Sequence, residues 1–85
     1  MRILIVEDEK KVSAFIKKGL EEETYAVDIA VDGEEGLLFG EQNQYDLIIL
    51  DLMLPKVDGL EVLSILRDRK IETPILLLTA KDSVE

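Results

Sequence analysis

The sequence has no cysteine and no histidine among its 85 residues. Without cysteine there are no disulfide bonds, thiolate metal ligands or cysteine nucleophiles. Without histidine the usual zinc ligand and the commonest general base are missing. Long hydrophobic runs are missing too, since no stretch approaches the ~20 apolar residues that cross a membrane. Met1 and Arg2 lead directly into a short strand-like run and not into a signal peptide. We therefore expect a cytoplasmic protein with no membrane partner.

Positive charge is scarce. Ten Lys and Arg residues stand against 19 Asp and Glu residues, which gives a net charge of −9. This balance argues against a segment that grips a nucleic-acid backbone by itself. The length allows one domain at most, and an apolar fraction of 47% is typical of a globular chain rather than a disordered one.

Three short apolar runs, at residues 3–6, 47–50 and 75–78, predict strands. Because none alternates with polar residues, each is typical of a strand buried on both faces of a parallel sheet. A buried helix is the alternative for the third run, although Pro74 before it favours a strand.

The segments between the runs predict three helices and an edge strand. Helical spacing of apolar residues predicts helices over 10–23, 34–43 and 58–69, and the alternating segment 24–31 predicts the edge strand. Asp58 is expected to cap the third helix, with Glu61 three residues later. Strands that alternate with helices indicate an α/β fold, a doubly wound parallel sheet with helices on both faces.

The same spacing predicts where individual side chains of these helices belong. Phe15 belongs to the apolar set of the first helix, and Leu60 is expected to face mostly inward in the third. Gly36 and Gly40 weaken the second helix, at a cost of about 1 kcal/mol each relative to alanine.

Acidic and hydroxyl side chains follow the predicted buried strands. Glu7 and Asp8 follow the first run, Asp51 follows the second, and Thr79 follows the last. If these strands are neighbours, the side chains meet beyond the carboxyl ends of the sheet. Two charges 4 Å apart repel by ~4 kcal/mol at an effective dielectric near 20, so such acids need a counter-charge, and Mg²⁺ suits a cluster of carboxylates. The plainer alternative is that these acids are solvated loop residues or helix caps.

These residues together carry a resemblance to a known family. The segments 3–9, 51–55, 58–59 and 74–80 (ILIVEDE, DLMLP, DG and PILLLTA) resemble the receiver domain of bacterial two-component response regulators, in the winged-helix OmpR/PhoB class. The resemblance covers the whole chain in the right order. It implies a flavodoxin-like sheet with strand order 2-1-3-4.

The resemblance also implies roles for individual residues. Asp51 matches the aspartate that accepts a phosphoryl group from a sensor histidine kinase. Asp8 matches the acid that binds Mg²⁺, Glu7 its acidic partner, and Met53 the residue whose backbone carbonyl binds the metal. Thr79 matches the hydroxyl that bonds the phosphoryl group. Such a domain is not an enzyme and catalyses only its own phosphorylation and dephosphorylation.

Two alternatives stay open. One is a phosphatase of the haloacid dehalogenase type, but that family needs a second Asp two residues after the first, where this sequence has Met53. The other is a receiver-like interaction module that has lost the switch.

The sequence also departs from the family pattern at its end. Residues 1–85 have no counterpart of the fourth helix, fifth strand, fifth helix or DNA-binding domain, so DNA would be bound only through a domain outside this segment. The run 75–78 is then an apolar edge strand, which predicts self-association of the chain.

Overall fold

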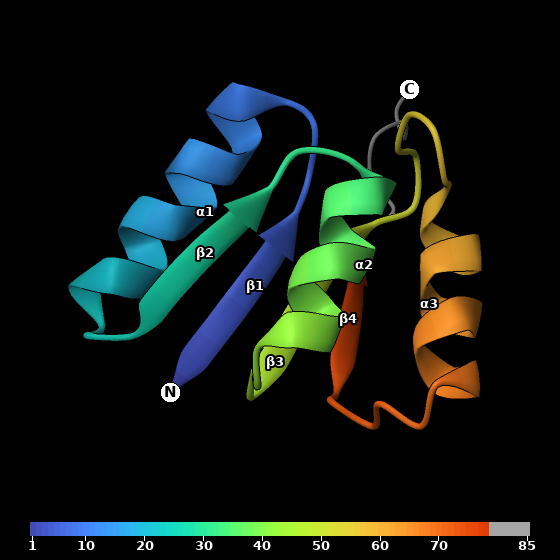
Figure 1. Cartoon of the computed structure of the whole chain (residues 1–85). Helices are drawn as coiled ribbons and strands as arrows, with labels where there is room; N and C mark the ends of the chain where they lie inside the picture. The colour runs from blue at the N-terminus through green and yellow to red at the C-terminus, as the bar shows by residue number, and fades with distance from the viewer. Residues whose placement is uncertain (79–85) are drawn as a thin grey trace.

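The computed structural model describes residues 1–78 of the chain. Strands and helices alternate from the first residues onward (Figure 1). The elements are β1 (Arg2–Val6), α1 (Lys10–Glu22), β2 (Ala26–Ala30), α2 (Gly33–Gln42), β3 (Leu47–Asp51), α3 (Gly59–Asp68) and β4 (Ile75–Leu78). The predicted α/β order is confirmed.

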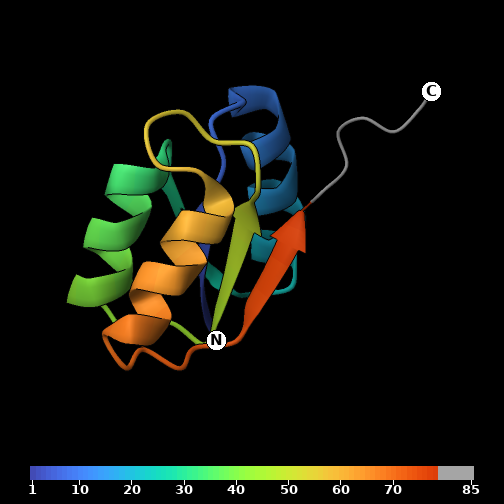
Figure 2. The same cartoon turned by 90° about the vertical axis from the view of Figure 1, so that its right-hand side faces the viewer.

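The strands form one parallel sheet in the order β2-β1-β3-β4, as the resemblance implied. Helix α1 covers one face, and α2 and α3 lie side by side on the other (Figure 2). In the part of the chain that the structure describes, no helix is long and apolar enough to cross a membrane.

The interior strands β1 and β3 supply the core on both faces. Ile3, Ile5 and Ile49 lie on the α1 side, while Leu4 and Leu50 lie on the side of α2 and α3. Side chains alternate along a strand, so a continuous apolar run fills both cores. The expectation of strands buried on both faces is thus confirmed for β1 and β3.

Strand β4 departs from that expectation. It is a strand and not a buried helix, but Leu76 is 54% exposed and Leu77 is 36% exposed. It lies at the edge of the four described strands and pairs only with β3 among them.

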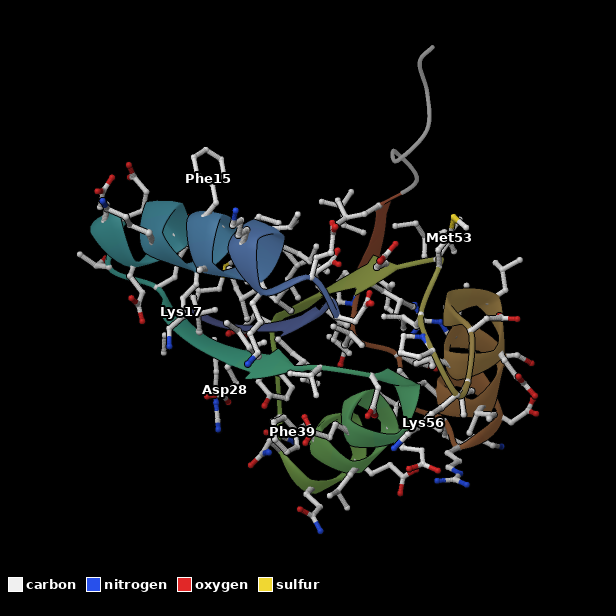
Figure 3. The ribbon with its side chains drawn as sticks, turned by 90° about the horizontal axis from the view of Figure 1, so that it is seen from above. Phe15, Lys17, Asp28, Phe39, Met53 and Lys56 are labelled. Carbon is white, nitrogen blue, oxygen red and sulfur yellow. The ribbon has the colours of Figure 1, made fainter. Side chains whose placement is uncertain are left out.

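Helix α1 buries a narrower stripe than its sequence suggests. Ile16 and Leu20 pack against the core, whereas Phe15 is 79% exposed and points away from the sheet (Figure 3). A step of four residues keeps Ile16 and Leu20 on one face, and Phe15 lies about 100° away from Ile16 around the helix. Phe15 thus belongs to the apolar set of the helix but not to the face that packs on the sheet.

Two glycines of α2 lie on the face that packs against β1 and α3. A Cβ atom on Gly36 would lie 2.9 Å from Val6 Cγ1, and one on Gly40 would lie 3.2 Å from Leu66 Cδ2. Their cost in helix propensity is therefore offset by close packing of α2 on β1 and α3.

Helix α3 begins at the predicted cap. Asp58 Oδ1 accepts the Glu61 N–H at 3.0 Å. The inward face comprises Val62 and Leu66, both fully buried, and Leu60 is 60% exposed. The expectation for Leu60 was wrong because Gly59 faces the sheet: a Cβ there would lie 2.4 Å from Asp51 O, which turns the next residue outward.

Charged groups at the amino end of the sheet form a paired network. Asp28 Oδ2 accepts the Tyr45 O–H at 2.7 Å and a guanidinium N–H of Arg2 at 3.0 Å. The Arg2 guanidinium also lies 5.0 Å from the centre of the Tyr45 ring, and its backbone N–H donates to Asp46 Oδ2 at 2.7 Å. Burial, and then the bond to Asp28, raise the pKa of Tyr45 to about 12.

Candidate metal and phosphoryl site

The carboxyl ends of the two interior strands place acidic side chains next to each other. Strand β1 is followed directly by Glu7 and Asp8, and β3 ends in Asp51. The strands pair in parallel with Val6 opposite Leu50, so the residues that follow these two lie at the same edge. This edge is the end where the strand arrows point in Figure 1.

The three carboxylates form one compact group. Glu7, Asp8 and Asp51 each offer an oxygen, and these oxygens lie within 4.8 Å of one another. Glu7 is 2% exposed and Asp51 is 1% exposed, whereas Asp8 lies on the surface. Solvent therefore reaches the group of carboxylates from the side of Asp8.

Backbone N–H groups orient the two buried carboxylates. Glu7 Oε2 accepts the Glu9 N–H at 2.9 Å, and Asp51 Oδ1 accepts the Met53 N–H at 3.1 Å. The Met53 side chain itself is 69% exposed and points outward (Figure 3). Met53 thus contacts Asp51 with its main chain and not with its side chain.

The loop between β3 and α3, residues 52–58, forms the outer wall of the site. Gly59 lies against the Asp51 backbone, and its N–H donates to Leu52 O at 3.0 Å. An open hollow of about 610 Å³ lies beside the loop, lined by Asp8, residues 52–55, Asp58 and Leu60. Of the three acids, Asp8 lines this hollow.

The donor set fits a hard divalent cation. Carboxylate and carbonyl oxygens are the ligands of Mg²⁺, and a sequence without cysteine or histidine is unsuited to zinc. Bringing three carboxylates together also costs about a few kcal/mol of repulsion per pair at an effective dielectric of ~20. A bound cation would offset this repulsion. The residues present therefore fit the metal that the sequence predicts.

Thr79, the remaining predicted site residue, lies outside the described residues. The sequence alone did not indicate the roles of two positions near the site, Lys56 in the loop and Gly59 at the start of α3. Gly59 is simply a turn glycine in the sequence, whereas in the structure a Cβ atom on it would lie 2.4 Å from Asp51 O, so this close approach sets how α3 meets β3. Lys56 was not considered, because an exposed lysine in a loop carries no signal in a single sequence.

Comparisons with known proteins agree with this geometry. A family model described as the response regulator receiver domain matches residues 3–85. This chain belongs to that family. The resemblance stated from the sequence is confirmed, and the family is a regulatory one.

Curated relatives of this receiver domain are transcriptional regulators. The transcriptional regulatory protein PcoR of Escherichia coli is 52% identical over 83 residues, which is 98% of this chain and 37% of that protein. The alkaline phosphatase synthesis transcriptional regulatory protein PhoP of Bacillus subtilis strain 168 is 49% identical over 81 residues, 95% of this chain and 34% of that protein. The chain thus spans little more than a third of these relatives.

Solved receiver structures share the fold. The response regulator TrrA of Thermotoga maritima, in complex with Mg²⁺ and BeF, matches with a TM-score of 0.88 and 44% identity, over 94% of this chain and 70% of that one. The receiver domain of a Pseudomonas aeruginosa PAO1 sensor histidine kinase, with a magnesium ion in its active-site cleft, gives a TM-score of 0.90 and 32% identity, over 94% and 67% of the chains.

Proposed function

We propose that this receiver domain accepts a phosphoryl group on Asp51 from a sensor histidine kinase, with Mg²⁺ bound beside it. The observation that carries the proposal is the position of Asp51. It ends an interior strand, is 1% exposed, and its carboxylate lies next to those of Glu7 and Asp8. The domain is then a regulatory switch that promotes only its own phosphorylation and dephosphorylation, and not an enzyme with a separate substrate.

The chemistry needs little from the protein besides position. One Asp51 carboxylate oxygen attacks the phosphorus of a phosphohistidine, the P–N bond breaks, and the imidazole keeps the electron pair. An acyl phosphate forms on Asp51. A carboxylate attacks without a general base, which agrees with a chain that contains no histidine.

We assign Asp8, Asp51 and the Met53 carbonyl as the metal ligands, with Glu7 as supporting acid. Bound Mg²⁺ would neutralise the charge on the transferring phosphoryl oxygens. The Met53 N–H fixes the Asp51 carboxylate through Oδ1. Thr79 is proposed, from the family resemblance alone, to donate to a phosphoryl oxygen.

The names of the relatives support an output in transcription. PcoR and PhoP are transcriptional regulatory proteins of which this chain matches about a third. We propose that residues 1–85 are the first part of a receiver domain in a cytoplasmic regulator, which binds DNA through a separate domain.

Labelling with acetyl phosphate tests the proposal. The full-length protein, incubated with acetyl phosphate and Mg²⁺, should gain the mass of one phosphoryl group. Asp51→Asn should abolish the gain, because the amide is not a phosphoryl acceptor. Asp46→Asn is the matched control at the other end of β3 and should be labelled like the wild type.

Other results would contradict the assignment. Undiminished labelling of Asp51→Asn would place the acceptor elsewhere. Absence of labelling in the wild type would favour the inert interaction module. Steady turnover of phosphate monoesters would favour a phosphatase.

Self-association of the 85-residue chain is also part of the proposal. Strand β4 offers an apolar edge in which Leu76 and Leu77 are exposed. Such an edge can pair with a second copy. Light scattering on the 85-residue chain should show a dimer, and a stable monomer at micromolar concentration would contradict it.

A further inference from the structure

Lys56 lies in the loop between β3 and α3 with an unusual backbone. Its φ is +68°, a region that favours glycine. The other described non-glycine residues with positive φ, Thr24 and Lys70, follow the ends of α1 and α3, where a left-handed residue commonly ends a helix. Lys56 ends no helix. The Val57 N–H donates to Pro55 O at 2.9 Å, which closes a tight three-residue turn centred on Lys56, and a positive φ at its centre makes such a turn strained.

The side chain of Lys56 reaches across to the start of α2. Its Nζ lies 3.5 Å from Asp32 Oδ2 and 3.5 Å from Glu34 Oε1. Asp32 is held in place because its Oδ1 caps α2 by accepting the Glu35 N–H at 2.9 Å. The negative charges of Asp32 and Glu34 raise the pKa of Lys56 above its ordinary value, which agrees with an ion pair at these distances.

The backbone of the loop meets α2 at the same place. A Cβ atom on Gly33 would lie 2.2 Å from Val57 O, so the first residue of α2 is in close contact with the residue after Lys56. The loop is therefore anchored on α2 by a backbone contact and by an ion pair next to it.

The opposite end of this loop carries the site. The Met53 N–H donates to Asp51 Oδ1, and only two residues separate Met53 from Lys56. In the view from above, Lys56 lies beside the start of α2, and Met53 lies at the other side of the loop (Figure 3). The turn at Lys56 and the main chain of Met53 are therefore joined by a segment of two residues.

We propose that Lys56 is a positioning residue for the metal site: its ion pair with Asp32 and Glu34 holds the strained turn on α2 and so fixes the Met53 main chain beside Asp51. This inference rests on the proposed function, because the site that Lys56 positions is the proposed Mg²⁺ site. Lys56 itself touches neither metal nor phosphoryl group.

The first test needs no metal. In the metal-free full-length protein, Lys56→Met keeps the length of the stem and loses the charge, so amide hydrogen exchange at Val57 and Gly59 should become faster. Lys56→Arg keeps the charge and should restore protection. Lys70→Met is the matched control, since it removes the same charge from another residue with positive φ and should leave both amides unchanged.

The second test is the Mg²⁺ affinity, measured by NMR titration. Lys56→Met should weaken binding about two- to five-fold, the range that one exposed ion pair supports. Lys56→Arg and Lys70→Met should bind like the wild type. Lys56→Gly loses the charge but relieves the turn, so it should bind between Lys56→Met and the wild type. Glu34→Gln should add little to Lys56→Met, because the two substitutions break the same pair.

Wild-type exchange rates and Mg²⁺ affinity in Lys56→Met would overturn the inference, as would Lys56→Gly binding more weakly than Lys56→Met. Failure of the proposed function gives a different result. If the wild-type protein binds no Mg²⁺, or Asp8→Asn binds it equally well, the metal site is wrong, while the metal-free exchange still decides whether Lys56 holds the loop.

Discussion

Acidic residues cluster at both ends of the sheet, but their surroundings differ. Toward the amino end, the side chain of Asp28, in the middle of β2, is bonded to the Tyr45 hydroxyl and to the Arg2 guanidinium, and Asp46 accepts the Arg2 N–H. Each of these acids holds two segments of the chain together. The counter-charge of Asp28 is the Arg2 guanidinium and is thus part of the protein.

At the carboxyl end, three acids converge on one another. Glu7, Asp8 and Asp51 bring carboxylate oxygens within 4.8 Å, and backbone N–H groups of Glu9 and Met53 orient two of them. In the proposed function, acidic residues stabilise the fold at one end of the sheet and bind a metal ion at the other. This difference predicts that substitutions at the two ends have opposite consequences.

The largest effect is expected from Asp8→Asn at the carboxyl end. Removing one of three carboxylates should weaken Mg²⁺ binding at least about tenfold. The metal-free protein should keep or gain free energy of unfolding, because one source of repulsion is gone. NMR titration and chemical denaturation measure the two quantities.

Glu21→Gln controls for net charge in that experiment. Glu21 lies on the surface in a pair with Lys17 at 3.8 Å, and its substitution should change the free energy of unfolding by less than about 0.5 kcal/mol. Equal loss of Mg²⁺ affinity in both variants would mean that overall charge, and not the site, governs binding.

Tyr45→Phe should have the reverse effect at the amino end. It removes the O–H bond to Asp28 and should lower the free energy of unfolding by about 1 kcal/mol. Mg²⁺ affinity should stay unchanged, since the acid group lies at the opposite end. A parallel loss of Mg²⁺ binding would show that the two ends are not independent.

The same tyrosine is expected to make the stability depend on pH in alkaline solution. The pKa of Tyr45 is about 12 in the folded protein and 10.0 in the free side chain. Between these values the unfolded chain loses the phenol proton while the folded protein retains it, so the contribution present below pH 10 is lost as the pH rises. The wild type should lose on the order of 1–2 kcal/mol more than Tyr45→Phe over this interval. Parallel pH profiles would contradict the shift.

The fold was predictable because the buried apolar runs indicate strands clearly. Which helix side chains face the sheet was not predictable. A run such as residues 47–50 has few alternatives to a buried strand. Phe15 and Leu60 are as apolar as their buried neighbours, and only the contacts of the helices with the sheet decide which face is covered. At α3 that choice depends on Gly59, whose close approach to Asp51 is not visible in the sequence.

The site was predictable for the acids and not for the loop that holds them. Strand ends place Glu7, Asp8 and Asp51 together through topology alone. The ion pair of Lys56 joins two loops that lie far apart in the sequence, and no spacing rule indicates such a contact.

Paramagnetic line broadening by Mn²⁺ tests the central claim most directly. Mn²⁺ accepts the same oxygen ligands as Mg²⁺ and broadens the NMR signals of nearby amides. In the full-length protein, substoichiometric Mn²⁺ should broaden the amides of Glu7, Asp8 and Asp51 most strongly and those of Arg2 and Asp46, at the amino end of the sheet, least. Excess Mg²⁺ should reverse the effect. Equal broadening at the two ends of the sheet would contradict the account, because the acids at the carboxyl end would then be no better a metal site than the paired acids at the amino end.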